Sequence, residues 1–203
     1  MATARLLYLH GFASTPASDK ALQLTAYCHR LGRGADCLVP AISAPAARTA
    51  QQLAQLVAAQ TQPICLLGSS LGGLYALWLA ERFKLPAILI NPALEITPEL
   101  ERTIGPYPMW HTNPYTGETT WLSQADLAIS HALVVTPTQA DRYWLMTQMG
   151  DEVLDYRHAV ARLPHAKHTI EKGGDHRFRG FKRHLPAMLA FADLHASVPK
   201  PPA

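Results

Sequence analysis

The chain alternates short apolar runs with longer stretches in which apolar residues recur at helical spacing. Most of the runs are apolar almost throughout, a pattern typical of strands that are buried on both faces of a parallel sheet. The pattern therefore predicts a sheet of about six strands. The expected strands are Leu6–His10, Asp36–Val39, Ile64–Gly68, Ala87–Asn91, Tyr143–Gln148 and Lys167–Glu171.

Helical periodicity predicts five helices, over Ser18–Leu31, Ala46–Ala59, Leu71–Phe83, Asp155–Leu163 and Phe178–Leu194. Ser18 and Asp155 are suitable N-caps, and Gly32 and Gly34 are expected to end the first helix. Strands and helices in alternation, joined by right-handed crossovers, predict an α/β fold: an open, doubly wound, mostly parallel sheet flanked by helices. Ligands of such sheets bind at the carboxyl ends of the strands.

The region from about 92 to 140 interrupts this alternation. It contains six prolines, with Tyr107, Trp110, Tyr115 and Trp121 among them. A long insertion after a strand is typical of a cap or lid over a site, and an irregular surface loop is the alternative. We expect a lid-like insertion in a single domain that spans residues 1–203. Trp110, Tyr115 and Trp121 are candidates for the wall of a substrate pocket, unless they only pack the insertion.

Composition narrows the classes of partner. Hydrophobic residues make up 48% of the 203 residues and charged residues 16%, which indicates a sizeable core rather than disorder. The net charge of +3 is not clustered, so we expect no nucleic-acid partner and no membrane-binding patch.

Cysteine usage and hydropathy indicate the compartment. Cys28, Cys37 and Cys65 do not have the spacing of metal ligands, and two of them lie in apolar segments where free buried thiols are common. No apolar stretch approaches the ~20 residues that span a bilayer, and the N-terminal apolar run is too short for a signal peptide. These features predict a cytoplasmic protein.

The candidate nucleophile is Ser70, in the run Gly68-Ser69-Ser70-Leu71-Gly72. This Gly-x-Ser-x-Gly pattern falls between an expected strand and an expected helix, where a sharp turn exposes the serine hydroxyl. Gly68 and Gly72 leave room for the turn, and the helix N-terminus favours developing negative charge. The alternative is an ordinary strand–helix turn of small residues. The neighbouring Ser69 is expected to be structural.

A serine nucleophile needs a base, and in this kind of sheet the partners follow the nucleophile in the order acid, then histidine. His176 is the candidate base because it lies in a glycine-rich loop between the last strand and the last helix. Asp151, directly after the fifth strand, is the first candidate for the acid. Asp155 is the second, although it also suits an N-cap. Glu152 and Asp175 are weaker candidates.

An oxyanion hole needs two backbone donors. The amide of Leu71 follows the nucleophile, and the amide of Phe12 follows the first strand, where Gly11 permits a tight turn. We therefore expect Phe12 and Leu71 to supply the two amides. His10 is expected to stabilise the loop through a hydrogen bond rather than to act as a base.

These features occur together with several further motifs in the same order along nearly the whole chain. The motifs are His10-Gly11-Phe12-Ala13-Ser14-Thr15-Pro16, Gly68-Ser69-Ser70-Leu71-Gly72-Gly73, Asn91-Pro92-Ala93, Asn113-Pro114-Tyr115-Thr116-Gly117, Gly150-Asp151-Glu152-Val153-Leu154-Asp155-Tyr156 and Gly173-Gly174-Asp175-His176. With them the chain resembles the α/β hydrolases, and specifically the short bacterial esterases of the YqiA type. The resemblance implies hydrolysis of short acyl esters or thioesters. It also implies Ser70, Asp151 and His176 as the triad, with no metal or organic cofactor.

Two segments depart from the pattern of that family. Asp175 stands where Asn is expected before the histidine, and Thr136–Arg142 matches poorly.

Two other functions remain open. The same residues could transfer an acyl group to an acceptor other than water, or the chain could be a binding module that kept the fold without turnover.

Overall fold

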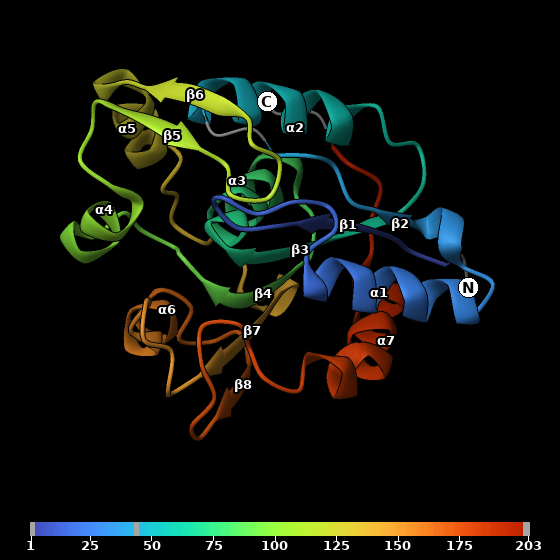
Figure 1. The fold of residues 1–203 in the computed structure, drawn as a ribbon. Coiled ribbons are helices and arrows are strands. Elements are labelled where there is room, and N and C mark those ends of the chain that lie inside the picture. Colours follow the sequence, from blue (N-terminus) through green and yellow to red (C-terminus); the bar gives the residue numbers. More distant parts are fainter. Residues whose placement is uncertain (1–2, 43–44, 201–203) are drawn as a thin grey trace.

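The computed structural model describes residues 3–42 and 45–200, and six parallel strands form its main sheet (Figure 1). The strand order is β2-β1-β3-β4-β7-β8. The strands are β1 (Arg5–Leu9), β2 (Cys37–Leu38), β3 (Ile64–Ser70), β4 (Ala87–Pro92), β7 (Tyr143–Gln148) and β8 (Lys167–Glu171). The predicted α/β fold with about six strands is confirmed.

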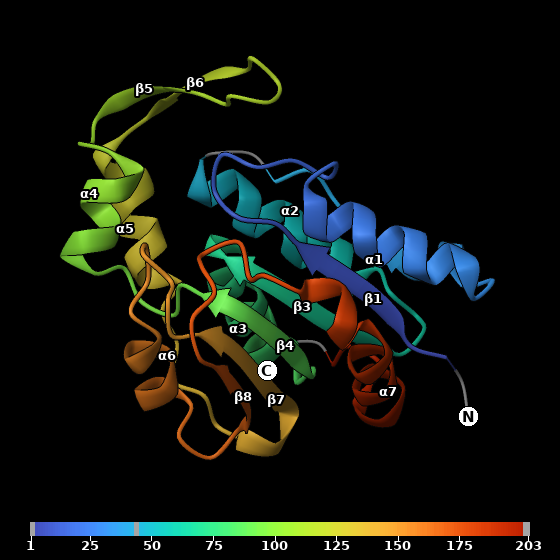
Figure 2. The same cartoon turned by 60° about the horizontal axis from the view of Figure 1, so that its bottom comes forward.

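Helices cover both faces of this sheet, as Figure 2 shows. Helices α1 (Asp19–Arg30) and α7 (Leu185–His195) pack on one face, while α2 (Ala46–Ala58), α3 (Leu71–Phe83) and α6 (Tyr156–Arg162) pack on the other. Successive strand residues face opposite layers, so the strands must be apolar at nearly every position. This explains the continuous apolar runs in the sequence.

The order of the strands reverses between β1 and β3. From β1 the chain moves outward to β2, and from β3 it moves in the other direction to β4. At such a switch point the loops after the two central strands diverge and leave a crevice at the carboxyl edge of the sheet. Ser70 ends β3 and Gly11 follows β1, so both lie at this crevice.

The insertion contains two short helices, α4 (Pro98–Ile104) and α5 (Gln124–Ala132), around an antiparallel hairpin of β5 (Met109–Thr112) and β6 (Thr119–Leu122). Figure 2 shows the hairpin standing off the main sheet. Thr97 caps α4, and Ser123 forms a capping box with Asp126 at α5. The insertion therefore has secondary structure of its own, and its role as a lid stays a prediction.

The helix predicted over Phe178–Leu194 is wrong at its start. Phe178 has φ +61° and Gly180 has φ +74°, both left-handed and incompatible with an α-helix. A 3₁₀ turn, η3 (Phe181–His184), follows, and α7 begins only at Leu185. The sign of φ at a non-glycine residue such as Phe178 cannot be recognised from hydrophobic periodicity.

The helix ends agree with most of the expected signals. Asp155 accepts a hydrogen bond from the amide of Arg157 and caps α6. Ser18 occupies the N-cap position of α1, although its side chain forms no capping bond. Gly32 has φ +71° just after that helix. All three cysteines are free thiols, and none of the helices in the described residues is long and apolar enough to cross a membrane.

Candidate active site

Ser70 lies at a sharp turn where β3 passes directly into α3. Its backbone has φ +56° and ψ −127°, which a residue with a side chain adopts only when its surroundings hold it there. Those surroundings are tight. A Cβ on Gly72 would lie 2.1 Å from the carbonyl oxygen of Leu9, and one on Gly68 would lie 2.4 Å from that of Gly72. The two glycines therefore allow the strand, the helix and β1 to meet closely at the serine.

The structure brings together Ser70, His176 and Asp151. The Nε2 atom of His176 lies 3.0 Å from the Ser70 Oγ atom, and its Nδ1 atom lies 2.9 Å from both carboxylate oxygens of Asp151. The Asp151 side chain is only 2% exposed and that of His176 22%. Because the carboxylate can only accept, it selects the tautomer that carries its proton on Nδ1 and leaves Nε2 free to accept from the serine hydroxyl.

Asp151 is held by the loop that begins directly after β7. Its Oδ1 atom accepts hydrogen bonds of 2.9 Å from the amides of Val153 and Leu154. Buried carboxylates need such donors because they have lost their water. The two amides also orient the carboxylate toward His176.

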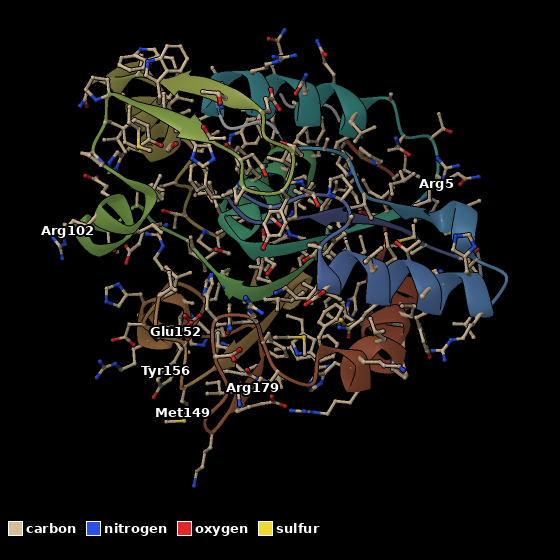
Figure 3. The ribbon with its side chains drawn as sticks, viewed as in Figure 1. Arg5, Arg102, Met149, Glu152, Tyr156 and Arg179 are labelled. Carbon is tan, nitrogen blue, oxygen red and sulfur yellow. The ribbon has the colours of Figure 1, made fainter. Side chains whose placement is uncertain are left out.

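The other candidate acids have different partners. Asp155 accepts hydrogen bonds from Arg157, and these lower the pKa of Asp155 to about 2. Asp175 pairs with Arg179 at 2.7 Å. Glu152 accepts a hydrogen bond of 3.0 Å from the backbone amide of His176, and Figure 3 labels Glu152 and Arg179 on the two neighbouring loops. Asp151 is thus the candidate whose carboxylate meets the imidazole ring.

Two buried amide side chains that sequence analysis missed position the histidine loop. Asn91, at the end of β4, donates to the carbonyl oxygens of Asp175 and His176, and its own oxygen accepts from the amide of Gln148. Gln148, at the end of β7, accepts from the amides of Asp175 and Arg179. A polar residue that ends an apolar strand was the available signal, since buried amides need partners.

The loop after β1 lies against the nucleophile. A Cβ on Gly11 would lie 3.1 Å from the Cβ of Ser70, so a larger residue would crowd the nucleophile. Phe12 and Leu71 line a small hollow of about 30 Å³ beside the turn. Leu71 is the first residue of α3, and its amide therefore has no partner within the helix.

His10 stabilises this loop in the way that the sequence predicts. Its Nε2 atom accepts a hydrogen bond from the amide of Ile42, and its Nδ1 atom donates to the carbonyl oxygen of Gly11. Burial lowers the pKa of His10 below its ordinary value of 6.5. The neutral ring, with one donor and one acceptor, fits both partners.

The hairpin of the insertion lies against the same loop. The ring of His111 packs on that of Phe12 with centroids 4.5 Å apart, and Asn113 donates to the carbonyl oxygen of Ser14. The Nε2 atom of His111 is buried without a hydrogen-bond partner. Sequence analysis did not single out His111. Its position on the inner face of a short hairpin becomes visible only once the register of β5 and β6 is known.

The three aromatic candidates of the insertion lie in two different places. Trp110 and Trp121 pair across the hairpin on its outer face, where they are 67% and 47% exposed. Neither lines the cavity that contains Ser70. Tyr115, at the hairpin loop, does line that cavity. Of the three, Tyr115 alone stays a candidate for contact with a substrate.

Ser70 and His176 face an open cavity of about 790 Å³. Its walls come from the loop after β1, the start of α1 and the segment that follows β8. Across the described residues, no group of three or more His, Cys, Asp or Glu side chains is arranged to hold a metal ion. The arrangement can activate a hydroxyl as a nucleophile beside a space that admits a small molecule.

Fold and site define the class of protein. The fold is that of the α/β hydrolases, and solved structures share it over most of their length. A protein from Agrobacterium vitis S4 is 21% identical with a TM-score of 0.74, covering 94% of this chain and 88% of its own. Alpha/beta hydrolase domain-containing protein 10 from mouse is 16% identical (TM-score 0.68, 95% and 90%). Est1E from Butyrivibrio proteoclasticus is also 16% identical (TM-score 0.64, 95% and 86%).

Within this class, the chain belongs to the uncharacterised protein family UPF0227. The model of that family matches residues 5–193, which is nearly the whole chain. The expected kinship with the YqiA-type proteins is thereby confirmed. The family's description assigns no reaction, so the function has to be argued from the site.

Proposed function

We propose that this protein is a serine esterase that hydrolyses short acyl esters or thioesters. One observation carries the proposal: a continuous chain of hydrogen bonds runs from Ser70 through His176 to Asp151 and faces a cavity. A serine at a strand–helix turn with a histidine base and a buried acid is the arrangement that acyl transfer requires.

In the first step, Nε2 of His176 takes the proton of the Ser70 hydroxyl while Oγ attacks the carbonyl carbon of the ester. The amides of Phe12 and Leu71 stabilise the negative charge on the carbonyl oxygen of the tetrahedral intermediate. Asp151 keeps the ring oriented and stabilises the imidazolium that forms. Collapse of the intermediate breaks the bond to the alcohol or thiol, which leaves with the proton from His176.

In the second step, water replaces the alcohol or thiol. His176 takes a proton from the water, whose oxygen attacks the acyl group on Ser70. The second intermediate collapses to release the carboxylic acid, and the proton returns to Oγ of Ser70. In both steps each proton that one group releases is accepted by another, and the mechanism uses no metal or organic cofactor.

The names of two distant structural neighbours suit this proposal. One is described as ferulic acid bound to Est1E from Butyrivibrio proteoclasticus, and another as the esterase domain of a Rhodothermus marinus protein. From these neighbours we carry over to this chain only the class of reaction, with a small ester as substrate.

The insertion over 92–140 is proposed as a lid, with Tyr115 facing the substrate. The free thiols support a cytoplasmic location.

Labelling with a fluorophosphonate probe tests the proposal. We expect the wild-type protein to be labelled at Ser70 and to hydrolyse p-nitrophenyl esters or acyl-CoAs from a panel of chain lengths. Ser70→Ala should lose both labelling and hydrolysis. The matched variant Ser69→Ala, which removes the neighbouring hydroxyl, should still be labelled. An unlabelled wild type, or equal labelling of Ser70→Ala, would contradict the proposal and favour a binding module.

A further inference from the structure

Several cations line the cavity beside Ser70 and take no part in the mechanism above. Lys20 comes from the first turn of α1, while Arg177 and Lys182 come from the segment after β8. Among the residues that the structure describes, the ion pairs all use other side chains. Positive charge without a carboxylate partner is therefore concentrated along this wall.

Lys20 is the most constrained of the three. Its side chain is half-buried, and its Nζ atom donates a hydrogen bond of 3.0 Å to the carbonyl oxygen of Arg177. In the described part of the chain this is the one hydrogen bond that the ammonium group makes. An ammonium group has three donors, so two remain for another acceptor. Arg177 and Lys182 are exposed and line the same cavity.

The nearby carboxylates act on Lys20 only at longer range, and none is within ion-pair distance of it. Asp175 is engaged with Arg179, and Asp151 is engaged with His176. Asp19 also lines the cavity but forms no ion pair with Lys20. The half-buried ammonium group of Lys20 has lost part of its water, and this burial lowers its pKa although Asp19, Asp175 and Asp151 act in the opposite direction. An anion that replaces this water gains more than it would from a fully hydrated surface lysine.

We propose that Lys20, with Arg177 and Lys182 beside it, binds an anionic group of the substrate. The preferred esters therefore carry a carboxylate or a phosphate near the scissile bond. This inference rests on the proposed esterase function, because it specifies the substrate of the same cavity. A pocket lined only by apolar side chains would instead favour neutral esters.

Matched pairs of esters test the inference. With charge on the acyl side, 4-nitrophenyl hydrogen adipate is compared with 4-nitrophenyl hexanoate. With charge on the alcohol side, 4-carboxyphenyl butyrate is compared with 4-carbamoylphenyl butyrate. The quantity compared is the ratio of kcat/KM in the wild type to that in Lys20→Met, so the intrinsic reactivity of each ester cancels.

We expect Lys20→Met to lower kcat/KM for the anionic ester of at least one pair about tenfold more than for its neutral partner, the effect of a charge-assisted hydrogen bond. Lys20→Arg should restore most of the difference. Lys182→Met, at an exposed position, should show a smaller loss with the same selectivity, independently of any effect of Lys20 on the loop. Lys172→Met, an exposed lysine outside the cavity, should show no selective loss.

Equal losses for both members of each pair would overturn the inference, because Lys20 would then only support the loop through Arg177. Inorganic phosphate and acetate, compared as competitive inhibitors at constant ionic strength, show which anion the site prefers. Inhibition that weakens in Lys20→Met supports the inference, and inhibition that is identical in both proteins opposes it. If neutral esters are cleaved without charge selectivity, this inference fails while the proposed esterase function stands.

Discussion

Each end of strand β7 meets a carboxylate that is almost fully buried. At the carboxyl end, Asp151 bonds to two backbone amides and to His176. At the amino end, Glu81 of α3 accepts hydrogen bonds from Thr138, Arg142 and Tyr143. Both carboxylates have lost most of their water and accept several hydrogen bonds; the donors to Glu81 are distant in the chain, whereas Asp151 combines two local amides with the distant His176.

The difference lies in what the partners do next. As far as the structure describes the chain, the donors around Glu81 bond only to Glu81 and, in the case of Arg142, to Thr138, so the cluster ties α3 to the segment that leads into β7. His176 instead has a second ring nitrogen, Nε2, which forms a hydrogen bond with Ser70. The orientation that Asp151 gives the ring therefore also orients Nε2 toward Ser70. Ligands bind at the carboxyl edge of a parallel sheet. A buried carboxylate at the opposite edge therefore serves stability, whereas one at the carboxyl edge can serve chemistry.

The largest effect should come from Asp151→Asn. The amide cannot hold His176 in the required tautomer, so we expect kcat for an activated ester to fall about 10⁴-fold with the fold preserved. Steady-state kinetics with p-nitrophenyl butyrate measure this fall in kcat. Asp155→Asn is the matched control and should retain kcat, because asparagine also caps helices. A large loss in Asp155→Asn with little loss in Asp151→Asn would reverse the assignment of the acid.

Glu81→Gln should have the opposite profile. It leaves Arg142 partly buried without its counterion, and we expect the free energy of unfolding to fall by about 3 kcal/mol. Urea unfolding followed by circular dichroism measures the loss, while kcat/KM per folded molecule should be retained. Asp141→Asn, an exposed carboxylate in the same segment, should change neither quantity. A loss of turnover in folded Glu81→Gln would contradict the view that Glu81 serves stability alone.

The smallest effect concerns pH. Burial alone would raise the pKa of Glu81, but the hydrogen bonds from Thr138 and Tyr143 lower it below its ordinary value of 4.5. The folded state therefore binds fewer protons than the unfolded state in this range. The stabilisation by Glu81 is present above pH 4.5 and is lost as the pH falls toward the lowered pKa.

Urea midpoints measured between pH 6 and pH 3 should consequently fall less steeply for Glu81→Gln than for the wild type. Parallel curves for the two proteins would mean that the pKa of Glu81 is the same in both states.

The sequence was sufficient for the features that depend on local pattern. Continuous apolar runs predict buried parallel strands, and the glycines around Ser70 predict a turn too crowded for side chains. His176 could be selected among ten histidines by its loop and its order in the chain. In the structure other histidines have partners elsewhere, such as Glu95 for His158 and Glu171 for His184.

Features that depend on long-range contacts could not be predicted. Sequence analysis assigned no role to the side chains of Asn91 and Gln148, because their partners lie 84 and 27 residues away along the chain. It also assigned none to Glu81, whose donors Thr138 and Arg142 lie in the poorly matching segment. In each case the pairing depends on tertiary packing rather than on spacing in the chain.

The hydrogen bond between Ser70 and His176 joins residues that are 106 positions apart. Between them β4, β7 and β8 must all find their register in the sheet. Contacts of such long sequence separation form slowly, because loop closure has to precede the pairing that stabilises them. Helices can thus form early in refolding, while the proposed cleavage of esters should return only when the last strand has docked. The time course of recovered turnover would therefore report when the sheet is complete.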